Sequence, residues 1–157
     1  MTTTAPSRVG FIGTGHIATF HSKMLRISGT NIVRGAVYDI DRARAEVFAS
    51  ASGSHVVNSE QEVIDQSDFV YICTWTSEHA RLVDMCIAAG KPFFCEKPLS
   101  TGFAPAREMA SRANAAGLVH QCGLILRRSP AYLWAHHLIT DPKAGAPMAV
   151  VFRDDQF

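Results

Sequence analysis

The sequence predicts an α/β fold of the doubly wound Rossmann type, a mostly parallel sheet with helices on both faces. Two observations predict it. Short apolar runs rich in Val, Ile and Phe alternate with longer segments whose apolar residues recur at helical spacing. A glycine-rich turn directly follows the first apolar run. Strand–helix alternation at this spacing gives right-handed crossovers, and therefore parallel strands.

Six apolar runs have the length and composition of buried strands. They are residues 8–13, 32–38, 55–57, 68–73, 92–95 and 118–124, of which 55–57 is the weakest. In the segments between them, apolar residues fall on one helical face, as Ile17, Phe20 and Met24 do. These segments are the predicted helices that cross from strand to strand.

Residues at the segment ends support the predicted helices. Asp41, Ser59 and Ser77 can accept hydrogen bonds from free amides at helix starts, and Ser59 with Glu62 has the spacing of a capping box. Pro105 and Pro130 fit a first helical turn, and Gly90 and Gly117 fit the residue just past a helix end.

Length and loop composition predict one domain and the beginning of a second. The 157 residues suit a domain plus a fragment. A loop near 140–147 carries an Asp-Pro pair, a glycine and a further proline, which is typical of a domain boundary. We predict a Rossmann domain over 1–140, followed over 141–157 by a linker and one strand at 148–152.

The composition excludes several classes of protein. A net charge of +1 without a basic run disfavours nucleic acid as a partner, and no stretch approaches the length of a membrane helix. The polar N-terminus has no apolar signal core. The four cysteines form no CxxC pair, so we expect buried free thiols, no metal site and a cytoplasmic protein.

The glycine-rich turn is the first candidate site. It reads GxGxxA over residues 13–18, directly between a predicted strand and a predicted helix. Gly13 permits the tight turn, Gly15 lets the backbone approach a diphosphate, and Ala18 keeps the helix close to the strand. The amides of His16 and Ile17, at the positive end of the helix dipole, are placed to meet that diphosphate. The alternative is a glycine turn with no ligand.

Asp39 is the second candidate, at the end of the second predicted strand. It lies 24 residues after Gly15, close to the spacing of about 20 at which the dinucleotide fingerprint places an acid. A carboxylate there accepts from ribose hydroxyls and repels a 2′-phosphate, which favours NAD. Arg42 and Arg44 follow closely and keep NADP open, because arginine accommodates that phosphate. A turn or cap role is the alternative.

The fourth and fifth strands end in further candidates. Thr74, Trp75 and Thr76 are placed to line a cleft at the carboxyl edge of the sheet, with hydroxyls for ribose or phosphate and an indole to cover a flat ring. The alternative is a helix cap and a core aromatic. His79 lies in the first turn of the next helix, where a structural role is the stronger interpretation.

Glu96 and Lys97 form an opposite-charge pair directly after the fifth strand. A lysine there can hold a substrate hydroxyl or exchange a proton with it. A surface salt bridge is the alternative, and spacing alone favours it.

Together these stretches resemble the Gfo/Idh/MocA oxidoreductases, a family that includes glucose–fructose oxidoreductases and inositol dehydrogenases. The resemblance covers nearly the whole chain. Its most specific part is Glu-Lys-Pro at 96–98 after the Ala-Gly-Lys helix end at 89–91, and 123–131 is similar to the family's Gly…Arg…Pro-Ala segment. Trp75 departs from the family's usual proline, and Ile125 from its usual asparagine.

The resemblance implies a nicotinamide cofactor, NAD with NADP as the alternative, and a sugar, cyclitol or related polyol as substrate. It implies that Lys97 is catalytic and that the Lys97–Pro98 bond is cis. It also implies that an α+β substrate domain, which mediates oligomers, is essentially absent here. The cofactor-binding residues expected on these grounds are Gly13, Gly15, His16, Ile17, Asp39, Thr74, Trp75, Thr76, His79, Glu96 and Lys97.

Three functions fit these expectations. The first is an NAD(P)-dependent oxidoreductase acting on CH–OH groups, of which this chain is the cofactor half and inactive alone. The second is one subunit of a split dehydrogenase, with a complementing chain supplying the substrate domain; a homo-oligomer is the other partner we expect. The third is a non-catalytic dinucleotide-binding module. An S-adenosylmethionine methyltransferase shares the glycine turn but leaves 96–98 unexplained.

Overall fold

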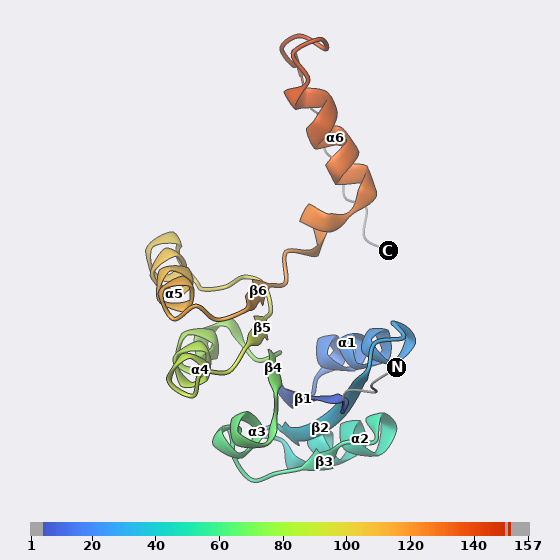
Figure 1. The fold of residues 1–157 in the computed structure, drawn as a ribbon, viewed down its shortest axis with the longest axis vertical. Helices are drawn as coiled ribbons and strands as arrows, with labels where there is room; N and C mark the ends of the chain where they lie inside the picture. Colours follow the sequence, from blue (N-terminus) through green and yellow to red (C-terminus); the bar gives the residue numbers. More distant parts are fainter. Residues whose placement is uncertain (1–4, 150, 152–157) are drawn as a thin grey trace. The chain divides into compact units, whose positions relative to one another are not determined.

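A computed structural model of the chain describes residues 5–149 and 151. Its sheet has six parallel strands in the order β3-β2-β1-β4-β5-β6, the strand order of a Rossmann fold (Figure 1). The strands are β1 (Ser7–Ile12), β2 (Ile32–Tyr38), β3 (His55–Val56), β4 (Phe69–Ile72), β5 (Phe93–Cys95) and β6 (His120–Cys122). The predicted fold class and all six strands are confirmed.

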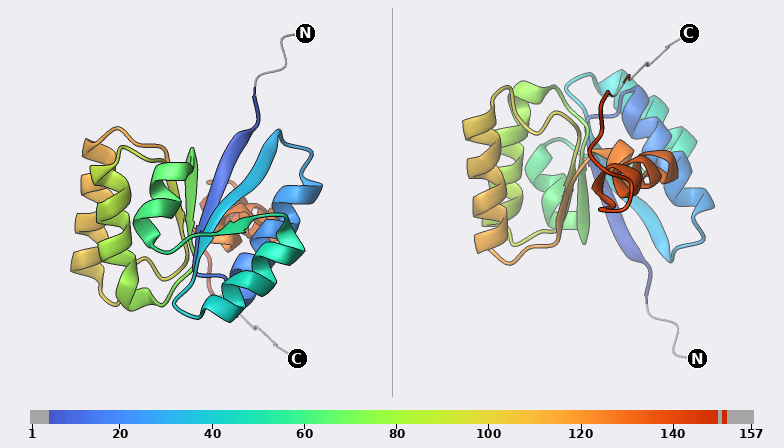
Figure 2. Two further views of the ribbon diagram at one scale, coloured as in Figure 1. Left: turned by 90° about the horizontal axis from the view of Figure 1, so that it is seen from below. Right: turned by 90° about the horizontal axis from the view of Figure 1, so that it is seen from above.

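Helices cover both faces of the sheet, namely α1 (His16–Ile27), α2 (Arg42–Ser52), α3 (Glu60–Gln66), α4 (Thr76–Ala88) and α5 (Phe103–Ala115). The chain continues with the 3₁₀ turn η1 (Ile125–Arg128) and α6 (Pro130–Thr140). Figure 2 shows α1 and α2 on one face, with α3, α4 and α5 on the other. This two-sided cover follows from right-handed crossovers that run outward from β1 in both directions.

Each face has its own apolar core. One cluster, which includes Ile12, Ile72 and Leu82, packs beneath α3, α4 and α5, and a second, which includes Phe11, Val37 and Phe48, packs beneath α1 and α2. Both faces of the central strands are therefore buried, as their continuous apolar runs predict.

The predicted helix ends hold, with two corrections. Asp41 and Ser59 accept from the amides of Arg44 and Glu62, each at 3.2 Å. The Glu62 carboxylate, however, accepts from the Asn58 amide, so the capping box is shifted by one residue. Ser77 is no cap, because α4 already begins at Thr76.

Glycines and prolines lie where the sequence predicts them. Gly90 and Gly117 follow α4 and α5 with φ of 63° and 66°, the left-handed conformation that glycine adopts without strain. Pro105 is in the first turn of α5, and Pro130 is the first residue of α6.

All four cysteines are free thiols, as predicted, and three of them are buried. Burial raises the pKa of the Cys86 thiol to about 12 and raises the pKa values of Cys73 and Cys95 as well. Among the described residues, no cluster of His, Cys, Asp and Glu could hold a metal ion. No helix of the described chain is long and apolar enough to cross a membrane.

The chain forms two compact units, residues 1–123 and 124–157. The first holds the whole sheet with α1–α5, and the second holds η1 and α6. The predicted boundary near residue 140 stays a prediction. Of the strand expected at 148–152, Val150 and Phe152 lie outside the described residues, and the remaining three residues carry no strand.

Candidate functional site

The glycine turn is held where β1, β2 and β4 end. The Gly13 amide donates to the Tyr38 carbonyl at 2.9 Å, and the Cys73 amide donates to the Ile12 carbonyl at 2.8 Å. Gly13 has φ of 84°, and a Cβ there would lie 2.5 Å from the Cys73 carbonyl oxygen. Conformation and space both require glycine at this position.

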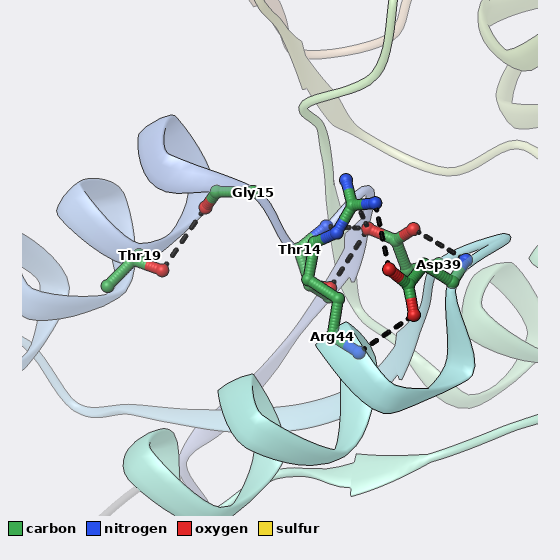
Figure 3. Close-up of polar contacts among 6 residues, drawn as sticks. Thr14, Gly15, Thr19, Asp39 and Arg44 are labelled. Atoms are coloured by element: carbon green, nitrogen blue, oxygen red, sulfur yellow. Dashed lines mark hydrogen bonds and ion pairs between the residues drawn. The ribbon is translucent and has the colours of Figure 1, made fainter.

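Gly15 lacks a side chain for a different reason. Its φ of −72° suits any residue, and a Cβ added there would meet no atom within 4 Å. The space in front of this backbone is therefore open to a ligand. Gly15 precedes α1, and its carbonyl accepts from the Thr19 amide at 3.0 Å and the Thr19 hydroxyl at 3.1 Å (Figure 3).

The first turn of α1 has free hydrogen-bond donors. No side chain caps this helix, and within residues 5–149 nothing accepts from the amides of Gly15, His16 or Ile17. Asp41 and Ser59 cap α2 and α3, whereas α4, α5 and α6 start without a side-chain cap, as α1 does. The start of α1 combines this lack of a cap with the open space in front of Gly15. Unbonded amides at the positive end of a helix dipole attract an anion.

Asp39 ties the end of β2 to the glycine turn (Figure 3). Its Oδ2 accepts from the Thr14 amide at 2.8 Å and the Thr14 hydroxyl at 3.0 Å, while Oδ1 accepts from the Asp41 amide at 2.9 Å. The side chain is only 6% exposed, and Arg44 Nη1 lies 4.0 Å from Oδ2. A carboxylate has about four acceptor positions, so about one remains for a ribose hydroxyl.

A cleft of about 620 Å³ opens at the carboxyl edge of β1, β2 and β4. It brings together five of the predicted residues: Gly13, Gly15, Asp39, Thr74 and Trp75. Trp75 stands at the start of α4 with 78% of its surface exposed. The cleft therefore lies where parallel sheets bind their ligands, beside the point at which the strand order reverses.

The far wall of the cleft was not predicted from the sequence. Arg81 of α4 pairs with Glu60 of α3 at 2.9 Å and with Glu78 at 3.0 Å, and all three side chains line the cleft. Ile40 and Leu82 add apolar surface. Arg81 and Glu78 have the local i,i+3 spacing of a helical ion pair, but only the packing of α3 against α4 brings Glu60 to them, and no local pattern predicts that contact.

A second hollow, of about 300 Å³, lies beside the first, between α1 and α2. His16, Lys23 and Arg44 give it a basic lining, and Gly15 and Arg44 belong to both hollows. Ile17 is 38% exposed on α1 and lines neither.

The surroundings of His79 favour the structural interpretation over a role as a cofactor ligand. The residue is 1% exposed. Its Nδ1 lies 2.9 Å from the Pro98 carbonyl and its Nε2 3.3 Å from the Thr74 carbonyl. The ring thus connects the loops that follow β4 and β5. Thr76, the first residue of α4, does not line the cleft either.

Glu96 and Lys97 do not pair with each other through their side chains. Glu96 is buried, and its Oε1 lies 2.6 Å from His21 Nε2, while its Oε2 accepts from the Lys97 amide at 2.9 Å. Lys97 itself is exposed, and no described side chain pairs with its ammonium group. The Lys97–Pro98 bond is cis, as predicted.

His21 is a residue that the sequence analysis missed. The available signal was its place on α1, three residues after the buried Ala18 and hence on the inward face. Its partner, 75 residues away in the chain, could not be foreseen.

Comparison with known proteins identifies the family. Residues 7–124 match the model of the "Oxidoreductase family, NAD-binding Rossmann fold", which is the Gfo/Idh/MocA model. The chain belongs to the Gfo/Idh/MocA oxidoreductase family. The sequence resemblance is thereby confirmed over most of the chain.

Relatives in this family include inositol 2-dehydrogenases. The chain is 40% identical over 131 residues to that of Cereibacter sphaeroides, covering 80% of this chain and 39% of the relative. It is 32% identical to that of Paracoccus denitrificans, covering 91% of this chain and 44% of the relative. The chain thus spans about two fifths of the length of these Gfo/Idh/MocA relatives.

Solved structures agree with this assignment. GenD2 from gentamicin A biosynthesis, determined in complex with NAD, matches with a TM-score of 0.81 and 26% identity, covering 92% of this chain and 42% of that one. An NAD-binding oxidoreductase from Klebsiella pneumoniae matches with a TM-score of 0.75 and 30% identity, covering 86% of this chain and 39% of that one.

Proposed function

We propose that this chain is the cofactor-binding half of an NAD-dependent oxidoreductase. The observation that carries the proposal is the start of α1, where three unbonded amides face the open space in front of Gly15. A dinucleotide diphosphate fits there, with its adenosine ribose against Asp39 and its adenine in the cleft beside Ile40 and Leu82. When bound, nicotinamide accepts or donates a hydride.

The carboxylate of Asp39 favours NAD as the cofactor. Its remaining acceptor position suits a ribose hydroxyl, and its charge repels a 2′-phosphate. Arg44 offers a counter-charge 4.0 Å away, but its guanidinium also pairs with Asp41 at 3.1 Å. With two carboxylates beside one guanidinium, a further phosphate at this point would be disfavoured, and NADP is the weaker ligand.

The proposed reaction moves a hydride between the nicotinamide and a CH–OH group of a sugar, cyclitol or related polyol. Relatives named inositol 2-dehydrogenase support this substrate class. Lys97 is exposed after β5, with no described partner for its ammonium group, so it is available to hold the reacting oxygen or to move its proton. The substrate domain would come from further residues of the same protein or from a partner chain. Free thiols fit the reducing cytoplasm.

Calorimetric titration of the chain with NADH and NADPH tests the proposal. NADH is expected to bind more tightly than NADPH. Gly15→Ala should weaken NADH binding at least about tenfold, because the new methyl group takes space that the diphosphate needs. Gly35→Ala is the matched control, since a Cβ there meets its nearest atoms at 3.7 Å and lies away from the cleft.

Failure of the parent chain to bind either nucleotide would refute the proposed cofactor site. Unchanged affinity in Gly15→Ala would refute its position at the glycine turn.

Lys97→Ala separates binding from chemistry. The variant should bind NADH like the parent, because the proposed contacts to the diphosphate, ribose and adenine come from other residues and the Lys97 ammonium group is left for the substrate. In a form of the protein that carries the substrate domain, it should lose most turnover, and normal turnover would exclude a catalytic Lys97.

A further inference from the structure

We propose that His21 is a positioning residue for Lys97, acting through the buried carboxylate of Glu96. The inference rests on the proposed function, because placing Lys97 precisely matters only if a cofactor binds beside it. His21 belongs to α1, the helix whose first turn would hold the diphosphate. Glu96 and Lys97 follow β5.

The His21–Glu96 contact is short and almost sealed from solvent. Nε2 and Oε1 are 2.6 Å apart, and the two side chains are 13% and 9% exposed. A carboxylate only accepts hydrogen bonds, so Nε2 is the donor. Hydrogen bonds to an ionised group are roughly twice as strong as neutral ones, and burial protects this one from water.

Aromatic neighbours fix the orientation of the His21 ring. The Phe94 ring meets it edge-on with centroids 4.9 Å apart, and the Tyr71 ring lies 5.3 Å away at a tilt. Both neighbours stand on strands of the sheet, β5 and β4. The ring therefore has little freedom to turn its Nε2 away from Glu96.

The second carboxylate oxygen continues the connection. Glu96 Oε2 accepts from the Lys97 amide at 2.9 Å, and the Glu96 amide donates to the Ile72 carbonyl at 3.0 Å. Gly123 faces this carboxylate, and a Cβ there would lie 3.0 Å from Oε2. The site thus leaves room for the carboxylate between α1 and the backbone of Lys97.

One carboxylate accordingly connects the helix of the diphosphate site to the backbone of the lysine. Catalysis depends on the distance between cofactor and reacting groups, where an error of about 1 Å costs about a hundredfold in rate. The ammonium group of Lys97 is left for the substrate, because Glu96 engages only the backbone of Lys97. The hydrogen bond from the Lys97 amide thus fixes the backbone of Lys97 and leaves its ammonium group unpaired with Glu96.

Replacements of His21 distinguish this role from packing. In His21→Gln the side-chain amide reaches about as far as Nε2 and keeps the donor, whereas in His21→Asn the amide nitrogen stops near the place of Nδ1. His21→Phe keeps the aromatic packing against Tyr71 and Phe94 without any donor. His55→Gln is the control, because His55 is an exposed histidine whose Nε2 contacts Gln66 at 2.9 Å.

The experiment uses NMR on the isotope-labelled full chain, with and without NADH. Two signals are followed: hydrogen exchange of the Lys97 amide, and the nuclear Overhauser effect between the Lys97 Cε methylene and the nicotinamide protons. His21→Gln and His55→Gln should match the parent in both. His21→Phe and His21→Asn should speed the amide exchange about tenfold or more and lose the Overhauser effect, while their free energies of unfolding stay positive in urea titrations.

Parent-like signals in both His21→Phe and His21→Asn would overturn the proposal, as would equal loss in His21→Gln. Absence of the Overhauser effect in the parent with NADH bound would overturn it too. If His21→Phe does not fold, His21→Asn decides the matter. A parent that binds no NADH refutes the proposed function instead, and the exchange rates then still show whether His21 holds the Lys97 backbone.

Discussion

Alanine substitutions at Gly13 and Gly15 should have very different consequences for folding, although the two glycines lie two positions apart in one motif. At Gly13 the φ of 84° costs a residue with a Cβ about 1–2 kcal/mol. The Cβ would also lie 2.5 Å from the Cys73 carbonyl oxygen, and relieving such overpacking costs about 1–3 kcal/mol. Gly13→Ala should therefore destabilise the chain by about 2–5 kcal/mol.

Gly15→Ala lacks both costs. The backbone conformation is already accessible to alanine, and nothing lies within 4 Å of the new methyl group. Alanine reduces the entropy of the unfolded chain but is a poorer helix cap than glycine, and the two effects are each below about 1 kcal/mol and opposite in sign. The free energy of unfolding should stay within about 1 kcal/mol of the parent.

Urea titration followed by far-ultraviolet circular dichroism measures both free energies of unfolding, with Gly35→Ala as the reference for a glycine inside a strand. Equal stability of Gly13→Ala and Gly15→Ala would refute the reasoning, because it would mean that the turn does not hold Gly13 against Cys73. A large loss in Gly15→Ala would mean that the space before α1 is filled by protein.

Three further predictions concern other parts of the chain. Asp39→Ser should raise the affinity for NADPH relative to NADH in calorimetric titrations, and should cost about 1–3 kcal/mol of stability because the Thr14 amide loses its acceptor; an unchanged affinity ratio would contradict the assignment of Asp39. Ser59→Ala should cost about 1 kcal/mol in urea titrations by removing the cap of α3, and equal stability would contradict that cap. Burial raises the pKa of Cys86 from 9.0 to about 12, so its thiol stays protonated in the folded chain at pH 8 and should resist iodoacetamide until urea unfolds the protein. Rapid alkylation of Cys86 in the folded chain would contradict this prediction. The same pKa shift predicts a contribution to the free energy of unfolding that is fully present below pH 9 and declines as the pH rises toward 12.

Local signals were enough to predict the fold. The alternation of apolar runs and helical segments gives the six parallel strands, because crossover handedness leaves few ways to arrange them. Asp41 and Ser59 were predictable because each acts within a few residues of its own position. Gly13 was predictable from the glycine-turn motif, although its contact with Cys73 is distant in sequence. The same holds for Gly90 and Gly117 at the helix ends.

The partners of the buried polar residues were not predictable. A structural role was the stronger interpretation of His79, but its partners, the Thr74 and Pro98 carbonyls on either side of its ring, were not foreseen. Glu96 looked like the partner of Lys97, yet α1 brings His21 to it from 75 residues away. Sequence spacing does not encode which groups meet across a sheet, so charges adjacent in the chain suggested a pair that the fold does not form.

An amide chemical-shift titration of the labelled chain with ADP-ribose tests the account most directly. Saturating ligand is expected to produce its largest shifts at the amides of Gly15, His16 and Ile17, with smaller shifts at the end of β2 around Asp39. Saturable shifts confined to another part of the chain, or an unchanged spectrum at millimolar ligand, would contradict the account.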